Sequence, residues 1–522
     1  MSSTFSGYYV AKSGIQAARA SLQITGQNMT NVNTTGYTRQ RVDCSTVGPN
    51  SSNMRYASGE IGIGGGVSCD RVSQIRDPYL DIRYRTERAL TGKTGTEANI
   101  LGELENIFDE TKKDGITTNF TDFLKQLNSL ASSSTMDENS LKSSARLLAH
   151  AFNTASQQLS TIRKTVTEEF QNDSIKKANQ LLQTIAHLNE EIKSADISGT
   201  PALELMDQRN TAIDELSQYV NIEVSTKTVS VGSNRTVSEL QIDLVSGSKK
   251  FNLVSNNNYS TFGTTTEADG TINLTLKDST GADVTDGTDA ISNKDITQGS
   301  FSAYLSMLNE SGEYDSAGEA ERGIGYYEKV LDKLAAYFAD TMNALNSTNP
   351  EGDNKPLFTQ ADGTTTTGIT AANISLSNAW YKATSNYLTP TKQTSSSGDT
   401  TTSKDNILLM VSKLAETKTF TTNDNNVGGN TLLTSSIQSF VSDISVSILA
   451  LQKADVNRRD ATCNATLNEI DTKRAATSSV DVNEEGINLI MYNQALTASS
   501  RFMTTLDEAI DTIINRMGIV GR

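Results

Sequence analysis

Hydrophobic residues recur every seven positions at both ends of the chain, the spacing of helices that bury a narrow stripe against another helix. Near the N-terminus the repeat consists of Tyr8, Ile15, Leu22 and Met29, followed at three positions further on by Ala11, Ala18, Thr25 and Val32. Near the C-terminus it consists of Leu489, Leu496, Met503 and Ile510, with Leu506 and Ile513 among the companions. No proline precedes Pro49 or follows Pro390. We therefore expect two long terminal helices, paired as a coiled coil.

Charge gives this pairing modest support. Residues 1–42 carry four basic side chains and no acidic one, whereas residues 481–522 carry six acidic side chains and three arginines. Opposite net charges favour association, although attraction between exposed charges is weak and screened by salt. A chance imbalance between two short segments explains the numbers equally well.

A second helical pattern fills the middle of the chain. Its apolar positions alternate spacings of three and four and comprise Leu141, Ala145, Leu148, Phe152, Ala155, Leu159, Ile162, Val166, Ala178, Leu182, Ile185, Leu188 and Ile192. They predict one helix over about 137–193, with Asp137 as a cap at its start and Gly199 ending it. The remaining helices are expected at about 97–109, 119–131, 203–218, 302–308, 324–346 and 432–476.

Between these helices, residues 221–299 change to the alternation of half-buried strands, as in Leu240, Ile242 and Leu244. Turn-rich segments separate the strands, which predicts an all-β insertion. A Thr/Ser/Gly-rich segment, 350–403, is expected to form a loop or a small extension. The fold class that follows is mainly α with β insertions.

Composition and motifs argue against an enzyme. The net charge of −16 disfavours a non-specific nucleic-acid binder. Two histidines exclude a His-rich metal site, and the three cysteines (Cys44, Cys69 and Cys463) match no zinc pattern and are too few for a disulfide framework. The sequence contains no phosphate-binding loop, zinc-protease motif or nucleophile elbow. We therefore assign no catalytic, cofactor-binding or metal-ligating residue.

Targeting signals are missing as well. The segment after Met1 has neither a basic region nor an apolar run of signal-peptide length, and no apolar stretch is long enough to cross a bilayer. Taken alone, these features predict a cytoplasmic protein without a membrane partner.

The most distinctive segment ends the first predicted helix and reads GQNMTNVNTTGYTRQRV, residues 26–42. Asn31 and Gly36 can stop a helix, and Tyr37, Arg39 and Gln40 then begin an extended strand. The pattern Asn-x-x-Asn-x-x-Thr-x-Gly-Tyr resembles the N-terminal motif of the bacterial flagellar rod, hook and hook-associated proteins. The Arg39-Gln40 pair that follows is similar to the members that form the first hook–filament junction.

Further resemblance to these junction proteins covers most of the chain. It includes Arg76, Asp77, Tyr79 and Leu80 within residues 59–85, and the Asp207-Gln208-Arg209 signature within residues 185–224. Residues 296–310 and 480–515 resemble the return into the helical domain and the shared C-terminal helix. Residues 350–403 match weakly.

The resemblance implies a nested axial protein. The expected domains are an inner-tube domain of 1–42 with 481–522, a helical middle domain of 43–220 with 300–349 and 404–480, the β-rich outer domain 221–299 and the extension 350–403. The assembly interface would comprise Tyr8, Ile15, Leu22, Met29, Asn31, Gly36, Tyr37, Arg39, Gln40, Leu489, Leu496, Met503, Leu506, Ile510 and Ile513.

The resemblance also implies partners and a location. The chain would leave the cell through the flagellar type III export channel, without a cleaved signal, and form a ring between the hook protein and hook-associated protein 3. The filament cap would be a transient partner, and an export chaperone would hold the C-terminal helix. A hook or rod subunit of the same axial family is the main alternative, and an enzyme domain carried on an axial scaffold is a remote one.

Overall fold

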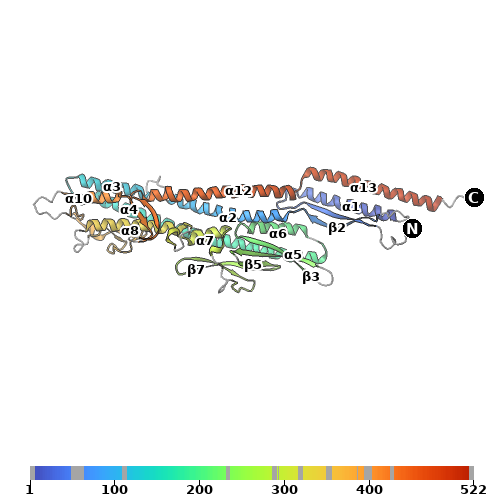
Figure 1. The fold of residues 1–522 in the computed structure, drawn as a ribbon, viewed down its shortest axis with the longest axis horizontal. Helices are drawn as coiled ribbons and strands as arrows, with labels where there is room; N and C mark the ends of the chain where they lie inside the picture. The colour runs from blue at the N-terminus through green and yellow to red at the C-terminus, as the bar shows by residue number, and fades with distance from the viewer. Residues whose placement is uncertain are drawn as a thin grey trace, which may run out of the picture.

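The computed structural model describes residues 6–516 except 49–63, 109–114, 201, 231–235, 248, 285–290, 292, 316–320, 348–354, 385, 393–402 and 424–427. Long helices run along the axis of an extended rod, and both ends of the described chain lie at the same end of that rod (Figure 1). The β-rich part lies against one flank. The prediction of a mainly α fold with β insertions is confirmed.

The helices dominate the chain. Their bounds are α1 Ser6–Thr30, α2 Pro78–Ile107, α3 Ile116–Ser132, α4 Asn139–Glu168, α5 Ile175–Ser198, α6 Leu203–Leu216, α7 Ser300–Asn309, α8 Ile324–Asn346, α9 Asn378–Lys382, α10 Asp405–Ala415, α11 Phe440–Asp443, α12 Ala450–Ser478 and α13 Val482–Asp511. Segments of wider, π-helical turns join α4 to α5 (Glu169–Ser174) and α11 to α12 (Ile444–Leu449), and extend α13 (Thr512–Arg516).

The strands form small antiparallel sheets. Their bounds are β1 Gln40–Val47, β2 Gly66–Gln74, β3 Ile222–Ser230, β4 Thr236–Ser246, β5 Lys249–Ser255, β6 Asn258–Tyr259, β7 Thr261–Thr266, β8 Ile272–Lys277, β9 Phe358–Gln360, β10 Ile374–Leu376, β11 Lys418–Thr421 and β12 Thr431–Ser435. The largest described sheet has the order β3-β4-β5-β6, and the other strands pair as β1-β2, β7-β8, β9-β10 and β11-β12.

Local signals in the sequence explain where the long helices begin and end. The Asp77 carboxylate caps α2 by accepting a hydrogen bond from the backbone N–H of Tyr79, and Pro78 occupies the first helical turn, where its missing N–H costs nothing. The Asp481 carboxylate caps α13 in the same way. Gly199 ends α5 in the left-handed region, at φ +84°.

The long predicted helix in the middle of the chain is confirmed, with one interruption. Helical backbone continues from α4 through the π-helical segment into α5, and the predicted apolar positions are buried except for the half-buried Ile162. Val166, Phe170 and Ile175 are spaced by four and then five residues. The wider turn keeps all three on the buried side.

Two predicted helix boundaries were wrong. The helix predicted at 97–109 is the C-terminal part of α2, which begins at Pro78. The helix predicted over 432–476 begins only at Phe440, because residues 431–435 form β12 and pair with β11. The first boundary is set locally, because the Asp77 cap and Pro78 begin α2. The second is set by tertiary pairing, because residues 431–435 have apolar spacing compatible with a helix yet pair as a strand.

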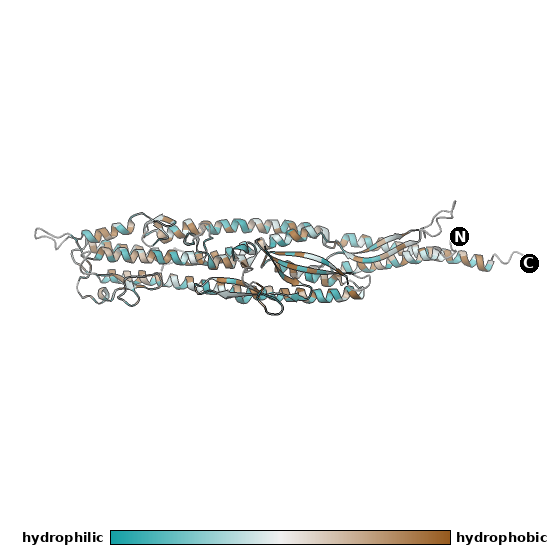
Figure 2. Cartoon of the chain, turned by 60° about the horizontal axis from the view of Figure 1, so that its bottom comes forward, coloured by the Kyte–Doolittle hydropathy of each residue, from teal (hydrophilic) through white to brown (hydrophobic). Residues whose placement is uncertain are grey.

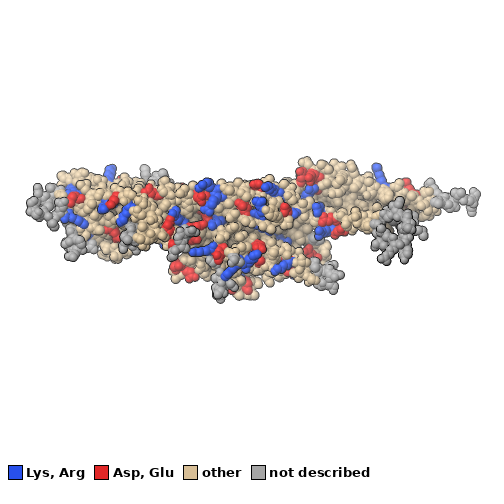
Figure 3. Space-filling model, viewed as in Figure 1, with Lys and Arg blue, Asp and Glu red and all other residues tan. Residues whose placement is uncertain are grey.

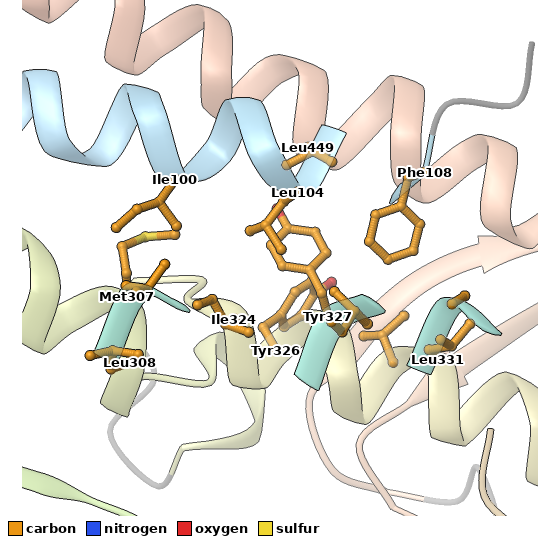
Figure 4. Packing of buried hydrophobic residues seen from close by; sticks show 14 of the residues in the cluster. Ile100, Leu104, Phe108, Met307, Leu308, Ile324, Tyr326, Tyr327, Leu331 and Leu449 are labelled. Carbon is orange, nitrogen blue, oxygen red and sulfur yellow. The ribbon is translucent and has the colours of Figure 1, made fainter. Parts of the chain in front are cut away.

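One continuous hydrophobic core joins the helices of the rod and extends into the β-rich flank. In the region drawn in Figure 4, Ile100 and Leu104 of α2 point toward Met307 of α7 and Tyr327 of α8. The β-rich part packs on α5, where the Asn179 side chain exchanges hydrogen bonds with the backbone of Phe262. The described part of residues 350–403 also packs on the rod, because the buried Trp380 donates to Glu138 at the start of α4.

Candidate assembly interface

The terminal helices α1 and α13 lie side by side and project beyond the rest of the rod (Figures 1 and 2). The Tyr8 hydroxyl donates a hydrogen bond of 2.9 Å to Asp507. Ala11, Ala18 and Thr25 of α1 are buried, whereas Tyr8, Ile15, Leu22 and Met29 are half-buried. On α13, Leu496, Met503, Leu506 and Ile510 are half-buried. The structure thus brings together the two terminal segments that carry the heptad repeats.

Small residues set the distance between the two helices, a feature that the heptad pattern did not reveal. A Cβ atom at Gly7 would lie 3.0 Å from a methyl group of Leu506, and one at Gly14 would lie 2.9 Å from the Ser499 hydroxyl. Both distances are below ordinary van der Waals contact, so a larger side chain at either position would require Leu506 or Ser499 to move.

The β1–β2 hairpin supports α1. The Ser13 hydroxyl accepts a hydrogen bond from the backbone N–H of Val67, at 3.2 Å, and donates to the carbonyl of Val10. Gly66, at φ +97°, approaches the backbone of Val10 where β2 begins. The hairpin and α13 therefore both contact α1.

The turn that follows α1 is held by Asn28. Its side-chain oxygen accepts hydrogen bonds from the Tyr37 hydroxyl at 2.9 Å and from the Gln40 N–H at 3.0 Å, and its amide nitrogen donates to the Gln40 carbonyl. Asn31 bonds back to the Gln27 carbonyl, and Gly36 takes φ +80°. The motif is a helix stop, as predicted, and its polar atoms are used within the chain.

Two contacts tie this turn to the rod. Both Thr38 donors, the backbone N–H and the hydroxyl, bond to the Asp207 carboxylate, at 2.9 and 2.6 Å. Arg39 reaches the first turn of α13, where it bonds to Glu485 at 2.8 Å and to Glu484 at 2.7 Å. We call this set, Thr38, Arg39, Asp207, Glu484 and Glu485, the joint.

A buried charge network continues from the joint into the rod. Arg474 of α12 bridges Asp81 of α2, at 3.0 Å, and Asp214 of α6, at 2.5 Å. Arg76 also binds Asp81, and Arg85 also binds Asp214. Such charges are tolerated when each has partners of opposite sign, and the network fixes how three helices meet below the terminal pair.

Burial shifts the pKa values of Asp207 in the joint and of the neighbouring Tyr37. Loss of hydration raises the pKa of Asp207, although the hydrogen bonds from Thr38 favour its charged form and oppose that rise. Burial, followed by the nearby Glu204, raises the pKa of Tyr37 to about 12. Tyr37 therefore stays neutral at physiological pH and remains a hydrogen-bond donor to Asn28.

Exposed apolar side chains lie along α13 and its π-helical continuation. We call this set the outer stripe, and it comprises Val482, Ile487, Leu489, Ile490, Met491, Phe502, Ile513 and Ile514, which are 37–70% exposed. The predicted interface residues Leu489 and Ile513 belong to it, whereas Leu496, Met503, Leu506 and Ile510 are half-buried. Between Gly486 and Leu506 the only charged residue is Arg501. Figure 3 shows correspondingly few charges over the terminal helices on the face it displays.

The predicted interface residues thus fall into three places. Those of α1 and the half-buried ones of α13 lie in the terminal pair, Leu489 and Ile513 lie on the outer stripe, and Asn31, Gly36, Tyr37, Arg39 and Gln40 lie in the turn after α1. Sequence reasoning missed Thr38 and Glu485. Both are buried polar residues, and a sequence offers no signal of the partner that makes such burial favourable.

The part of the chain that the structure describes contains little that suggests other chemistry. No group of three or more His, Cys, Asp or Glu side chains among these residues could hold a metal ion. None of the described helices has the length and hydropathy to span a bilayer. A cavity of about 320 Å³ between α2, α12 and the segment from α7 to the residues before α8 is lined by Glu97, Arg322 and Arg459, among others.

Comparison with known proteins agrees with this picture. Residues 101–357 match the family model described as the flagellar hook-associated protein FlgK helical domain. The chain is 28% identical over its whole length to flagellar hook-associated protein 1 of Bacillus subtilis (strain 168), all of whose length is covered.

More distant relatives match in part. Proteins of the same name from Salmonella typhimurium and Escherichia coli (strain K12) are 27% identical over 41% of this chain, which spans 38% and 39% of their lengths. A solved structure of the flagellar hook junction protein FlgK from Burkholderia pseudomallei aligns over 54% of this chain and 45% of its own, with 20% identity and a TM-score of 0.38.

The full-length relative, the family model and the terminal helix pair converge on a single assignment. The chain is similar along its whole length to a flagellar hook-associated protein 1, and its residues 101–357 match the FlgK helical domain. These matches support a structural role in the bacterial flagellum rather than an enzymatic one.

Proposed function

We propose that this protein is the subunit of the junction between hook and filament, and that it assembles with copies of itself through α1 and α13. The outer stripe of α13 is the observation that carries the proposal. Large apolar side chains such as Ile490 (59% exposed) and Ile514 (70% exposed) are unfavourable in water on a long helix whose other side already faces α1. Covering them against neighbouring subunits would stabilise a ring by roughly 1.5–3 kcal/mol for each fully buried side chain.

The nested domain arrangement supports the same role. The terminal pair would form the inner tube, the long helices from α2 to α12 the middle layer, and the sheet β3-β4-β5-β6 would face outward. In the described chain the terminal pair projects from one end of the rod and the sheet lies on its flank (Figure 1). The joint would then transmit load between the inner and middle layers.

Position in the axial structure defines the proposed partners. The ring would contact the hook protein on one side and hook-associated protein 3 on the other, with the filament cap as a transient neighbour. Export would use the flagellar type III channel without a cleaved signal, and a chaperone would cover the outer stripe of α13 before export. An apolar stripe of this length requires a cover in the cytoplasm.

A hook or rod subunit of the same axial family is the alternative. Imaging of intact flagella with an antibody against this chain distinguishes the two. A single narrow band at the hook tip supports the junction subunit, and a continuous coat along the hook contradicts it.

Assembly itself is tested by adding purified protein to hooks that lack a junction. We expect the Ile487→Asp/Ile490→Asp variant to keep the melting temperature of the helical rod and to lose binding at the hook tip, because the outer stripe contributes to contacts between subunits and not to the core. Leu506→Asp/Ile510→Asp should lose binding as well, by separating α13 from α1.

Asn493→Asp is the matched control, since it adds a charge at an exposed polar position of the same helix. It should bind like the unmodified protein. Normal capping of hooks and filament growth with the Ile487→Asp/Ile490→Asp variant would show that the outer stripe is not the assembly surface. Because purified protein is added directly, a defect in export cannot produce the same result.

A further inference from the structure

Two of the three cysteines face each other across the β1–β2 hairpin. Cys44 of β1 lies directly opposite Cys69 of β2 in the antiparallel register, and their sulfur atoms are 3.1 Å apart. Both side chains are exposed. The third cysteine, Cys463, lies on α12 and interacts with Glu87 of α2.

The backbone geometry at this pair suits a disulfide. Residues directly opposite each other in antiparallel strands have Cα atoms about 4.5–5.5 Å apart, which lies within the 4.4–6.8 Å range of disulfides. The two thiols already touch, so closing the bond needs only small side-chain movements. No rearrangement of the strands is required.

We propose that Cys44 and Cys69 form a disulfide after the protein has left the cytoplasm. The flagellum is a surface structure, where disulfides persist, whereas the cytoplasm keeps thiols reduced. A bond that closes only outside the cell would leave the chain free of cross-links while it is still inside.

The chemistry is thiol–disulfide exchange with a low-molecular-weight disulfide as the oxidant. One cysteine gives up its proton, and its thiolate attacks a sulfur of the oxidant, forms a mixed disulfide and releases one small thiolate, which takes up that proton. The second cysteine then gives up its proton and attacks the protein sulfur of the mixed disulfide. This step forms the Cys44–Cys69 bond and releases the second small thiolate, which takes up the proton. The protein loses two protons and two electrons, and the oxidant receives them.

The local environment makes this reaction slow rather than impossible. Loss of hydration, and then the hydrogen bond with Cys69, raises the pKa of the Cys44 thiol to about 11. Asp43 and Asp70 contribute to the rise, although Asp43 itself pairs with Arg41 and Arg71. Because the thiolate is the reactive form, we expect closure over minutes to hours.

The bond would brace the element that supports α1. The register of the hairpin shifts between Asp43 and Cys44, so the pair sits beside an irregularity of the ladder. A cross-link at this point fixes the pairing of the strands that continue to Val67, which bonds to Ser13 of α1. The disulfide is therefore expected to slow local opening of the hairpin next to the terminal helices.

The test starts with the reduced full-length protein and adds oxidised glutathione at neutral pH. Trypsin without reductant should release residues 42–55 linked to residues 56–71, with a mass about 2 Da below the sum of the two peptides. Hydrogen exchange in β1 and β2 should slow several-fold on oxidation. The Cys463→Ser variant should behave identically, and Cys44→Ser should lose both effects.

Sheared flagella and the cytoplasm of the same cells, alkylated before lysis, provide the decisive comparison. We expect the linked peptide in the flagella and alkylated Cys44 and Cys69 in the cytoplasm. Free thiols at both positions in flagella would overturn the proposal. So would glutathione retained on separate cysteines, a link to Cys463, or a dimer joined through these residues.

Discussion

At the scale of single residues, Glu97 of α2 is an acidic side chain in an unfavourable, buried position. It is 3% exposed, and neither carboxylate oxygen has a hydrogen-bond partner. Lys93 and Arg459 lie 3.6 and 3.7 Å away, too far for a hydrogen bond. Burial, followed by the nearby Glu321, raises the pKa of Glu97 from 4.5 to about 7.

This shift predicts a specific pH dependence. Between pH 4.5 and 7 the unfolded chain loses the Glu97 proton while the folded chain keeps it, so the free energy of unfolding decreases as the pH rises through this window. The loss, roughly 3 kcal/mol for a shift of about 2.5 pKa units, is complete at about pH 8, one unit above the folded-state pKa. Glu97→Gln keeps the shape of the side chain without the charge. The variant should be more stable than the unmodified protein at pH 8, and this gain in stability should be much smaller at pH 5.5.

Urea unfolding at the two pH values measures the difference. Lys93 and Arg459 retain Glu321 and Asp455 as partners in the variant, so no cation is stranded. Glu103→Gln, an exposed change on the same helix, is the control and should leave the pH dependence as it is. An equal effect of Glu97→Gln at both pH values would contradict the assignment of a titrating, buried carboxyl.

At the scale of elements, the joint connects the terminal helices to the rod through few contacts. Arg39 is central because its backbone N–H bonds to the Ser478 carbonyl at the end of α12, and its guanidinium binds Glu485 at the start of α13. Glu485 is 2% exposed. A carboxylate this deeply buried depends on the cation that faces it.

Arg39→Ala should therefore lower the free energy of local opening at the joint by about 1–3 kcal/mol, the cost of a buried group that loses its partner. We expect faster hydrogen exchange in the first turns of α13 and in the turn after α1, with little change in α4. Arg41→Ala is the matched control, because Arg41 is exposed and its partner Asp43 keeps Arg71. Equal exchange in the two variants would show that the joint does not depend on the ion pair.

At the scale of the whole molecule, stability is unevenly distributed. The rod and the β-rich flank share one continuous core, whereas the terminal pair buries only a narrow seam beside an exposed apolar stripe. We therefore expect the monomer to exchange amide hydrogens rapidly in α1 and α13 and slowly in α4 and α5.

Hydrogen exchange at low concentration and within assembled junctions measures this contrast. Protection of α1 and α13 should appear on assembly, because neighbouring subunits would cover the outer stripe. Strong protection of both helices in the dilute monomer would show that the terminal pair is stable by itself.

The sequence by itself determined the elements whose signals are local. The apolar spacing of α4 and α5, the alternation of β4 and β8 and the helix stop at Gly36 each depend on residues close together in the chain, so they could be read without the fold. The fold class followed from these elements, and the resemblance to flagellar axial proteins from the motif after α1.

Only the tertiary structure decided which distant residues meet. Residues 431–435 pair with β11 as a strand although their apolar spacing suited a helix, and Gly14 of α1 packs against the Ser499 side chain of α13. Leu489 and Leu496 belong to one heptad repeat and so share a face of α13, yet Leu489 is 37% exposed and Leu496 is half-buried. The joint and the Cys44–Cys69 contact likewise join residues far apart in the chain. Their energy comes from burial and hydrogen bonding between separate elements, which exist only once the chain has folded.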